Sequence, residues 1–439
     1  MQDRAERPVD DPRAIATVTD SSASAVSARA AVLVAVAGVI VLIVCAVAPP
    51  GGLGSIPDDT DVGLYSEYAR RTFEGQVPYR DFGLEYPPAV LPVLLAPATS
   101  DESTYYDRFR LLMLAIAAAA VVLLVVALHR VRVDTAQLAA AVLVLATMPR
   151  TLAPELVLDR FDLWPATLVL LAVVALLYGR RTVGLVALGV GGAAKVYPLA
   201  VVPLALLARR GTARVRSELL VVASAAVVIA LPFVLLAPRG VARVGWLLAR
   251  RELQIESLGA SALLAAHQLG LYTPAVHYSF GVGNSWDLAG SAPRIVAFVG
   301  SLAQVAAVAT VWILFRRSTR EPRELLVAVA AAVVGFVAFG KILSPQYLVW
   351  VLAAVPLAVG RVSRFTLPAA VVAALLTRSV YRAGYGDLIE AGPWSWVVLA
   401  RNLVLVTIFV ALALELASRA RSPAQAHVDA ESTAGSHAR

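Results

Sequence analysis

The sequence predicts an all-α polytopic membrane protein, and two observations lead to this class. Hydrophobic residues make up 59% of the 439 residues and charged residues 15%, whereas soluble domains have roughly 45–50% and about 25%. The apolar residues are also gathered into long runs, and the first of them, 30–48, is long enough to span ~30 Å of hydrocarbon. A soluble globular protein and a disordered chain are therefore excluded.

Further apolar runs set the expected number of helices. They occupy about 109–128, 135–150, 163–178, 182–208, 217–236, 294–315, 324–360, 365–381 and 394–416. Two of them, 182–208 and 324–360, begin and end at arginine-rich loops, so each is predicted to be a helical hairpin. Two hairpins bring the bundle to about twelve helices, and two single tilted helices bring it to ten.

The positive charge of the chain is explained by its topology. Lysine and arginine number 38 and acidic residues 30, a net charge of +8. Most arginines lie in short loops between apolar runs, which the positive-inside rule assigns to the cytoplasm. Both termini are then cytoplasmic and two long segments, 49–107 and 237–292, lie outside a plasma membrane. This spacing does not favour nucleic acid as a partner.

The two ends of the chain differ from the bundle. Residues 1–28 and 418–439 lack apolar periodicity and are predicted to be disordered cytoplasmic tails around one transmembrane domain at 29–417. The single cysteine, Cys45, excludes a disulfide framework, and the histidines have no partners at metal-ligand spacing. The chain has no glycine-rich phosphate loop. We therefore expect neither a metal ion nor a cofactor.

Segment 49–107 holds a cluster of carboxylates at Asp58, Asp59 and Asp61. The apolar positions that follow recur at helical spacing until Gly75, which predicts an amphipathic surface helix. Two interpretations of the cluster stay open. Thr60 or Asp61 caps this helix, or a carboxylate takes the proton of an acceptor hydroxyl, for which it must approach within ~3 Å.

Other charged segments also carry two interpretations each. Asp81 and Glu85 are solvated loop charges, Asp81 beside Arg80, or they belong to a site. In segment 237–292, residues 246–266 are predicted to form a surface helix. Its polar side is solvated or binds sugar hydroxyls, and it holds Arg250, Arg251, Glu252, Gln254, Glu256 and Ser257.

Three stretches, taken in order, resemble one family of membrane enzymes. The first joins Asp61-x-x-x-Tyr65, Gly-x-x-Pro-Tyr-x-Asp-Phe at 75–82 and Glu-Tyr-Pro-Pro at 85–88. The others are Gly-Gly-Ala-Ala-Lys-Val-Tyr-Pro at 191–198 and Lys-Ile-Leu-Ser-Pro-Gln-Tyr-Leu at 341–348. Over residues 30–416 this order is similar to glycosyltransferase family 87 (DUF2029), mannosyltransferases of the GT-C superfamily.

The resemblance implies a GT-C-like bundle and a specific reaction. A sugar, most often mannose in this family, would pass with inversion from a polyprenyl-phosphate donor to a glycolipid or glycan acceptor of the cell envelope, beside the membrane lipids. The family's catalytic aspartate falls on Asp61, with Asp58 and Asp59 as neighbouring alternatives. The candidate substrate-binding residues, some from these motifs and the cations from their charge and position, are Tyr65, Asp81, Glu85, Lys195, Tyr197, Lys341, Gln346 and Arg378. Residues 270–292 match no part of the pattern.

The two lysines of the chain, Lys195 and Lys341, lie near the tips of the predicted hairpins. A charge at the bilayer centre costs about 2.5–3.5 kcal/mol, so it tends to mark function. Each lysine either snorkels to the outer interface or stabilises the phosphate leaving group. Arg378 and Arg401 bind the same phosphate or pair with carboxylates, for which the candidates are Asp387 and Glu390.

Two rival classes explain part of the sequence. A transporter or lipid flippase accounts for the many helices and for Arg378 and Arg401, but it predicts two related halves with broken helices. An assembly subunit without catalysis leaves the charges from Asp61 to Glu85 as a structural cap.

Overall fold

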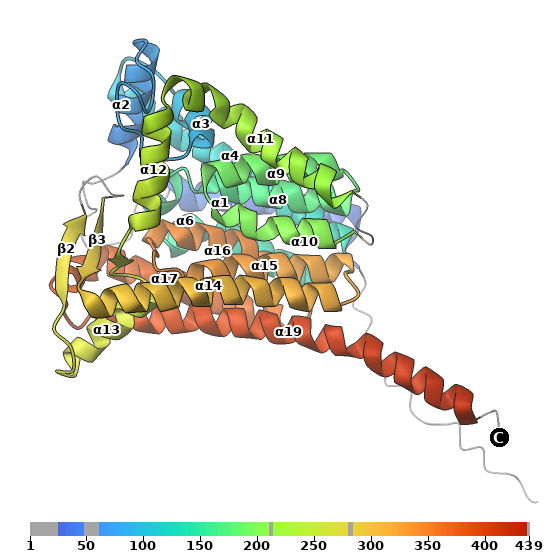
Figure 1. Cartoon of the computed structure of the whole chain (residues 1–439). Coiled ribbons are helices and arrows are strands. Elements are labelled where there is room, and N and C mark those ends of the chain that lie inside the picture. The colour runs from blue at the N-terminus through green and yellow to red at the C-terminus, as the bar shows by residue number, and fades with distance from the viewer. Residues whose placement is uncertain (1–24, 48–60, 210–213, 280–283, 437–439) are drawn as a thin grey trace, which may run out of the picture.

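The computed structural model describes residues 25–47, 61–209, 214–279 and 284–436, and helices dominate it (Figure 1). Five described helices are long and apolar enough to cross a membrane. They are α1 (Ala28–Val47), α4 (Glu102–Arg130), α11 (Val215–Leu236), α14 (Ser291–Arg317) and the Ser395–Arg419 part of α19 (Ser395–Ser436). The predicted class, an all-α membrane protein, is confirmed. The count of ten to twelve crossings stays a prediction beyond these five.

The remaining elements are shorter and fill the space between these helices. The longer ones are α5 (Thr135–Ala146), α8 (Leu163–Leu177), α9 (Arg181–Ala194), α15 (Pro322–Ala338) and α17 (Ser363–Ser379). The shortest are α3 (Leu91–Leu95), α6 (Met148–Thr151), α7 (Pro154–Leu158), α10 (Val202–Leu207), α16 (Leu348–Ala354) and α18 (Tyr385–Ile389). Short 3₁₀ turns lie at Pro88–Val90, Tyr197–Val201, Pro345–Tyr347 and Val355–Leu357, and a π-helical turn lies at Val380–Gly384.

Several helices begin where a carboxylate satisfies their free backbone N–H groups. Asp101 accepts a hydrogen bond from the Thr104 amide at the start of α4 (2.7 Å), and Asp134 accepts one from the Gln137 amide at the start of α5 (2.8 Å). Glu321 opens α15 with a reciprocal capping box. These are local signals, so the sequence reveals them without the fold.

The two predicted hairpins are confirmed. Run 182–208 breaks at Lys195 into α9 and α10, and Arg181 at the start of α9 donates a hydrogen bond to the Ala205 carbonyl near the end of α10 (3.0 Å). The halves therefore run antiparallel. Run 324–360 likewise breaks after α15, which packs against α16. The break in each run lies at or beside its lysine, and neither half is long enough to cross ~30 Å alone.

One end of the bundle carries a separate layer, which we call the cavity end (Figure 1). It consists of α2 (Val62–Phe73), α12 (Pro238–Arg250), α13 (Leu258–Gln268) and an antiparallel sheet of β1 (Leu253–Gln254), β3 (Ser285–Ala289) and β2 (Ala275–Ser279), in that order. The predicted amphipathic helix is confirmed as α2, whose Tyr65 and Ala69 are buried. The predicted helix 246–266 is wrong, because the chain leaves α12 after Arg250 and pairs with β3 before α13 begins.

The predicted tails differ from the structure at both ends. The α19 helix continues through Ser436, into the stretch predicted to be disordered, where alanine, arginine and glutamate are good helix formers. At the other end, Val26 is buried and its amide bonds the Val133 carbonyl (3.0 Å). Residues 1–24 of the first predicted tail lie outside the described residues.

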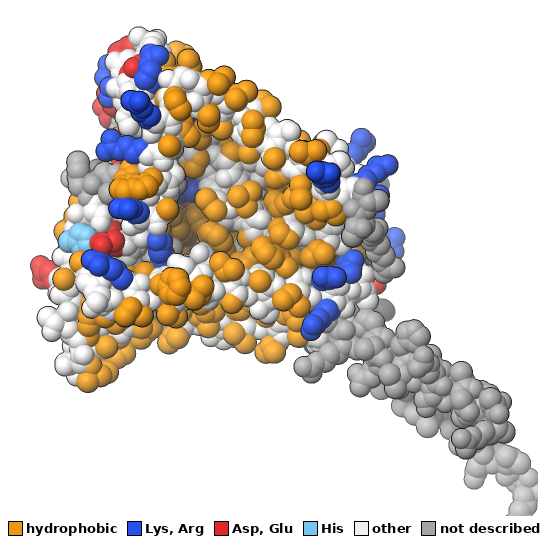
Figure 2. Space-filling view, viewed as in Figure 1, with side chains coloured by type: hydrophobic (Ala, Val, Ile, Leu, Met, Phe, Trp, Pro, Cys, Tyr) orange, Lys and Arg blue, Asp and Glu red, His pale blue; other side chains and the backbone are white. Residues whose placement is uncertain are grey.

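The surface supports the membrane assignment. In Figure 2, hydrophobic side chains cover the middle of the visible face, whereas lysine and arginine side chains gather towards its two ends. The 18-residue apolar window of α11 is only 6% buried, so this helix presents apolar side chains outward. Figure 2 also shows this face hollowed between α11 and α14. An apolar band between charged ends is the pattern that a bilayer stabilises.

Candidate functional site

A cavity of about 660 Å³ lies at the cavity end of the bundle. Its walls come from segments far apart in the chain: the start of α2, the turn between α7 and α8, both hairpin tips, strands β2 and β3, and the π-helical turn with α18. Six predicted site residues line it: Asp61, Glu85, Lys195, Tyr197, Lys341 and Gln346. A cavity of this size, lined by apolar and polar side chains, fits a small ligand or a ligand headgroup.

Asp61 lies at the first turn of α2, but its side chain does not cap the helix. Its Oδ2 instead accepts hydrogen bonds from the hydroxyls of Tyr65 (3.2 Å) and Tyr86 (3.3 Å) and forms an ion pair with Arg160. The carboxylate is 25% exposed towards the cavity. A side-chain cap at Asp61 is therefore wrong. Asp58, Asp59 and Thr60 lie outside the described residues.

Sequence reasoning missed Arg160, which lies in the turn between α7 and α8. The carboxylates on either side of it have other partners: Asp159 pairs with Arg110 (2.8 Å), and Asp162 accepts a hydrogen bond from the Trp350 indole (2.9 Å). The turn therefore directs Arg160 to Asp61. The only signal in the sequence was a basic residue among acidic ones before an apolar run.

Lys195 is enclosed by aromatic rings and does not snorkel to the surface. Its Nζ lies 3.3 Å from Asp162 Oδ1, and it sits over the rings of Phe161 (4.8 Å), Tyr347 (5.4 Å) and Trp350 (5.5 Å). The side chain is 16% exposed and lines the cavity. Cation–π contacts and the buried carboxylate together stabilise this charge away from water.

Tyr197 belongs to a column of three stacked rings. Trp350 stacks on Tyr197 (centroids 4.2 Å apart) and on Tyr347 (4.0 Å apart). Tyr197 is 1% exposed, and among the described residues its hydroxyl has no hydrogen-bond partner. A buried hydroxyl without a partner loses free energy, so a ligand group or water in the cavity is its natural partner.

Lys341 and Arg251 form a second basic group on the cavity wall. Lys341 Nζ donates to the carbonyls of Ala249 (3.1 Å) and Arg251 (2.7 Å), and Arg251 Nη2 donates to Ser285 Oγ (2.8 Å). Within the described part of the chain, neither cation has a carboxylate at ion-pair distance. The prediction placed Arg251 on the polar side of a helix 246–266, whereas the structure places it between α12 and β1, on the cavity wall.

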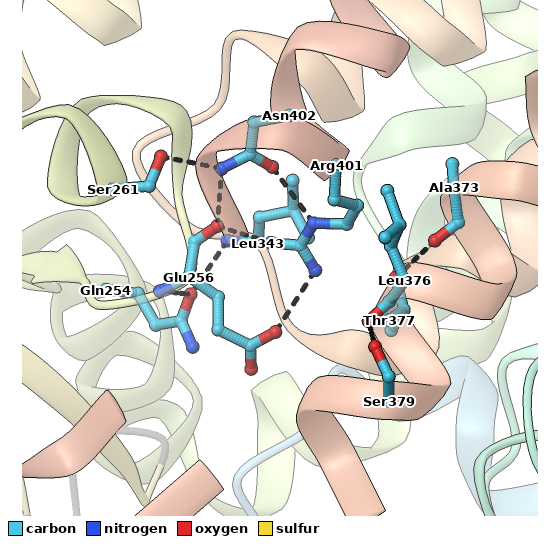
Figure 3. A network of polar contacts seen from close by, with 10 residues as sticks. All are labelled: Gln254, Glu256, Ser261, Leu343, Ala373, Leu376, Thr377, Ser379, Arg401 and Asn402. Atoms are coloured by element: carbon cyan, nitrogen blue, oxygen red, sulfur yellow. Dashed lines mark hydrogen bonds and ion pairs between the residues drawn. The ribbon is translucent and has the colours of Figure 1, made fainter. Parts of the chain in front are cut away.

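A buried polar network holds this second group in place (Figure 3). Arg401 of α19 pairs with Glu256 (3.1 Å), and both side chains are at most 1% exposed. Asn402 donates to the Glu256 carbonyl (3.0 Å). The side-chain Oε1 of Gln254 accepts from the backbone N–H of Leu343 (3.3 Å), and the backbone N–H of Gln254 donates to the Lys341 carbonyl (3.1 Å). The network thus ties α19 to the segment after α12 and to the Lys341 loop.

The network also corrects the predictions for Arg401. It pairs with Glu256 in place of Asp387 or Glu390, and it does not line the cavity. Asp387 instead accepts a hydrogen bond from the Trp394 amide (2.8 Å). The partner of Arg401 lies far away in the chain, so local charge spacing did not reveal it.

Three predicted site residues, Tyr65, Asp81 and Arg378, lie outside the cavity lining. Asp81 pairs with Arg80 (2.9 Å) and accepts from the Val77 amide (2.7 Å), and the hydrogen bond from Arg80 lowers the pKa of Asp81 to about 2. Asp81 is thus the loop charge of the first interpretation. Arg378 donates to the Arg150 carbonyl and does not line the cavity, and among the described residues no ion pair joins it to Asp387 or Glu390.

Glu85 joins two distant segments at the cavity wall. It accepts a hydrogen bond from the Asn284 amide group beside β3 (2.7 Å). Burial raises the pKa of Glu85, and the nearby Arg251 charge and the Asn284 hydrogen bond oppose this rise. Tyr65 is buried behind the wall, where it contacts two residues that line the cavity, Asp61 and Tyr86.

Among the described residues, no group of three or more His, Cys, Asp or Glu side chains is arranged to hold a metal ion. Metal independence stays a prediction. Six charged side chains of the described ranges face the cavity: the acid–base candidate Asp61, a second carboxylate, Glu85, and the cations Arg160, Lys195, Arg251 and Lys341. This set can accept a proton and bind an oxyanion.

Comparison with known proteins adds no assignment. No protein-family model matches the chain, and no curated protein matches its sequence.

Proposed function

We propose that this protein is an inverting glycosyltransferase with a GT-C-like bundle. It transfers a sugar, mannose on the sequence resemblance, from a polyprenyl-phosphate donor to a glycolipid or glycan acceptor at the outer face of the plasma membrane. The observation that carries the proposal is the convergence of Asp61 with the basic side chains on one cavity. Both termini are cytoplasmic in this proposal.

The reaction assigns one task to each group. Asp61 takes the proton of the acceptor hydroxyl, and the acceptor oxygen forms a bond to the anomeric carbon while the bond from that carbon to the phosphate oxygen breaks. The leaving group is a phosphate monoester, which is stable as an anion and needs no general acid. Fixed cations that face the developing charge lower the barrier. We assign this task to Lys195 and Lys341, with Arg251 beside Lys341.

The hollow between α11 and α14 supports a lipid-linked donor (Figure 2). Ser301 and Gln304 of α14 line the cavity. Val196 and Leu199, just past the tip of the first hairpin, are 55% and 43% exposed. An apolar chain on this surface keeps its phosphate at the cavity and its tail among membrane lipids.

The rival classes lose part of the support that they had from the sequence. Arg378 and Arg401, which a transporter uses as intramembrane charges, have partners within the protein and do not line the cavity. Asp61 faces the cavity and does not serve as a side-chain cap, which an assembly subunit requires. These contacts favour the transferase over both.

The test is transfer of labelled mannose from polyprenyl-phosphate mannose in membranes that contain the full chain. An Asp61→Asn variant is expected to lose about 10²–10⁴-fold in rate, which is the usual contribution of a general base. Glu67→Gln is the matched control, because Glu67 lies on the same helix but pairs with Arg70 in solvent (2.7 Å). Wild-type transfer by Asp61→Asn would show that another residue is the base.

Absence of transfer by the wild-type chain, from this donor to any envelope acceptor, would exclude the proposed reaction. Movement of the labelled lipid between leaflets without transfer would instead identify a flippase.

A further inference from the structure

The β2–β3 hairpin forms the part of the cavity wall for which the sequence offered no interpretation. Tyr278 of β2 and Ser285 and Trp286 of β3 line the cavity, together with Asn284 just before β3. All of them lie in 270–292, the stretch outside the family resemblance. The wall therefore has a chemistry that the transferase motifs do not describe.

Two aromatic side chains dominate this wall. Tyr278 and Trp286 are directly opposite each other across the strand pair, and their rings meet edge to face, 5.3 Å between centroids. The neighbouring pair, His277 and Asp287, is also opposite in register, and neither of its residues lines the cavity. The aromatic pair, unlike the His277–Asp287 pair, therefore belongs to the face of the strands that lines the cavity.

Polar groups complete the same wall. Asn284 donates to the Glu85 carboxylate (2.7 Å), and Arg251 donates to the Ser285 hydroxyl (2.8 Å). Glu85 is followed by Tyr86, whose hydroxyl donates to Asp61 (3.3 Å). Glu85, which accepts from Asn284, is thus one residue along the chain from Tyr86, the side chain that contacts the candidate base.

This combination matches the chemistry of a sugar ring. A pyranose has an apolar C–H face that packs on aromatic rings, and hydroxyls that both donate and accept hydrogen bonds. A carboxylate accepts hydrogen bonds from such hydroxyls, and an amide beside it can both donate to them and accept from them. A phosphate would instead be repelled by Glu85.

We propose that Tyr278, Trp286, Asn284 and Glu85 form the subsite for the acceptor's sugar ring and direct one of its hydroxyls to Asp61. The inference rests on the proposed function for its role in transfer. The occupant is a hexopyranose headgroup, carried by a lipid or by a glycan. The donor phosphate lies at Lys195 and Lys341, and Arg251, which donates to Ser285, joins these basic groups to the aromatic wall.

The binding test uses the full chain in lipid nanodiscs with octyl α-mannoside and octyl β-glucoside as probes, measured by saturation-transfer NMR and by titration. Trp286→Ala and Tyr278→Ala are expected to weaken binding of at least one glycoside about tenfold, and Trp286→Phe to retain most of it. His277→Ala is the matched control, because His277 lies on the same strand, outside the cavity wall, and contacts Glu252 (3.0 Å). It is expected to bind as the wild type does.

The kinetic test measures KM for acceptor and donor separately. Trp286→Ala is expected to raise the acceptor KM about tenfold and to leave the donor KM unchanged. Wild-type glycoside affinity in both aromatic variants, no binding by the wild-type chain, or equal losses in His277→Ala would overturn the subsite. Glycoside binding that depends on the hairpin without any transfer would support the subsite and reject the transferase. Transfer by Trp286→Ala with an unchanged acceptor KM would support the transferase and reject the subsite.

Discussion

The carboxylate of Asp61 and the guanidinium of Arg160 form an ion pair at the cavity wall, although they come from segment 49–107 and from the turn before α8. Arg160 is 15% exposed in this pair. The Asp61 carboxylate thus has three partners, Arg160 and the hydroxyls of Tyr65 and Tyr86, which together fix its orientation. A base that is held in this way is already oriented before the acceptor arrives.

Loss of Arg160 is expected to slow transfer without weakening donor binding. In Arg160→Gln, the Asp61 carboxylate loses one of its three partners, and we expect kcat to fall about tenfold while the donor KM stays within about twofold. Arg160→Lys should recover part of the rate. Arg70→Gln is the control, because Arg70 is half-exposed on α2 and contacts Glu67. An equal loss in the lysine and glutamine variants, with an unchanged melting temperature, would argue against orientation by charge.

Lys341 is expected to act on the donor. It has no carboxylate at ion-pair distance among the described residues, so its charge is available to a phosphate. Lys341→Met should raise the donor KM about tenfold, and Lys341→Arg should restore most of the affinity, because a charge-assisted hydrogen bond contributes about 1.5–3 kcal/mol. Arg250→Met is the control, since Arg250 stacks over Trp246 (4.1 Å) and does not line the cavity. An unchanged donor KM in Lys341→Met would exclude this role.

The Glu256–Arg401 pair is expected to matter for stability. Removing one partner leaves the other charge buried and uncompensated, which typically costs 3–5 kcal/mol, about the range expected for Arg401→Met here. The double variant Glu256→Leu, Arg401→Met should lose less than Arg401→Met alone, since no unpaired charge remains. Thermal unfolding in nanodiscs measures both. A double variant that is as unstable as the sum of the single variants would show that the two charges do not depend on each other.

Glu85 is expected to make stability depend on pH. Burial raises the pKa of Glu85 above its usual value of 4.5. Between that value and the raised pKa, the folded chain binds more protons than the unfolded chain, so the free energy of unfolding falls as pH increases through this window. Glu85→Gln should remove this part of the slope. Melting temperatures from pH 4.5 upward test the sign, with Glu67→Gln as the control, and a slope that survives in Glu85→Gln would assign it to another group.

Local patterns predicted the elements of the site better than its contacts. The amphipathic spacing after Asp61 predicted α2, and the arginine-flanked runs predicted the breaks at Lys195 and Lys341. The helix predicted at 246–266 failed, because β1 pairs with β3 and tertiary pairing overrides propensity over a short stretch. That error grouped Arg251 and Glu256 on one polar helix side, whereas Arg251 lines the cavity and Glu256 is buried with Arg401.

By itself, the sequence determined that this is a helical membrane protein, where its apolar runs begin and end, and which carboxylate and lysines are candidates for chemistry. Hydropathy and helical periodicity are local properties, so they can be read along the chain. Only the tertiary structure decided which charges pair: Asp61 with Arg160, Lys195 with Asp162, and Arg401 with Glu256. These contacts join residues distant in the chain, and burial away from water is what makes each partner necessary.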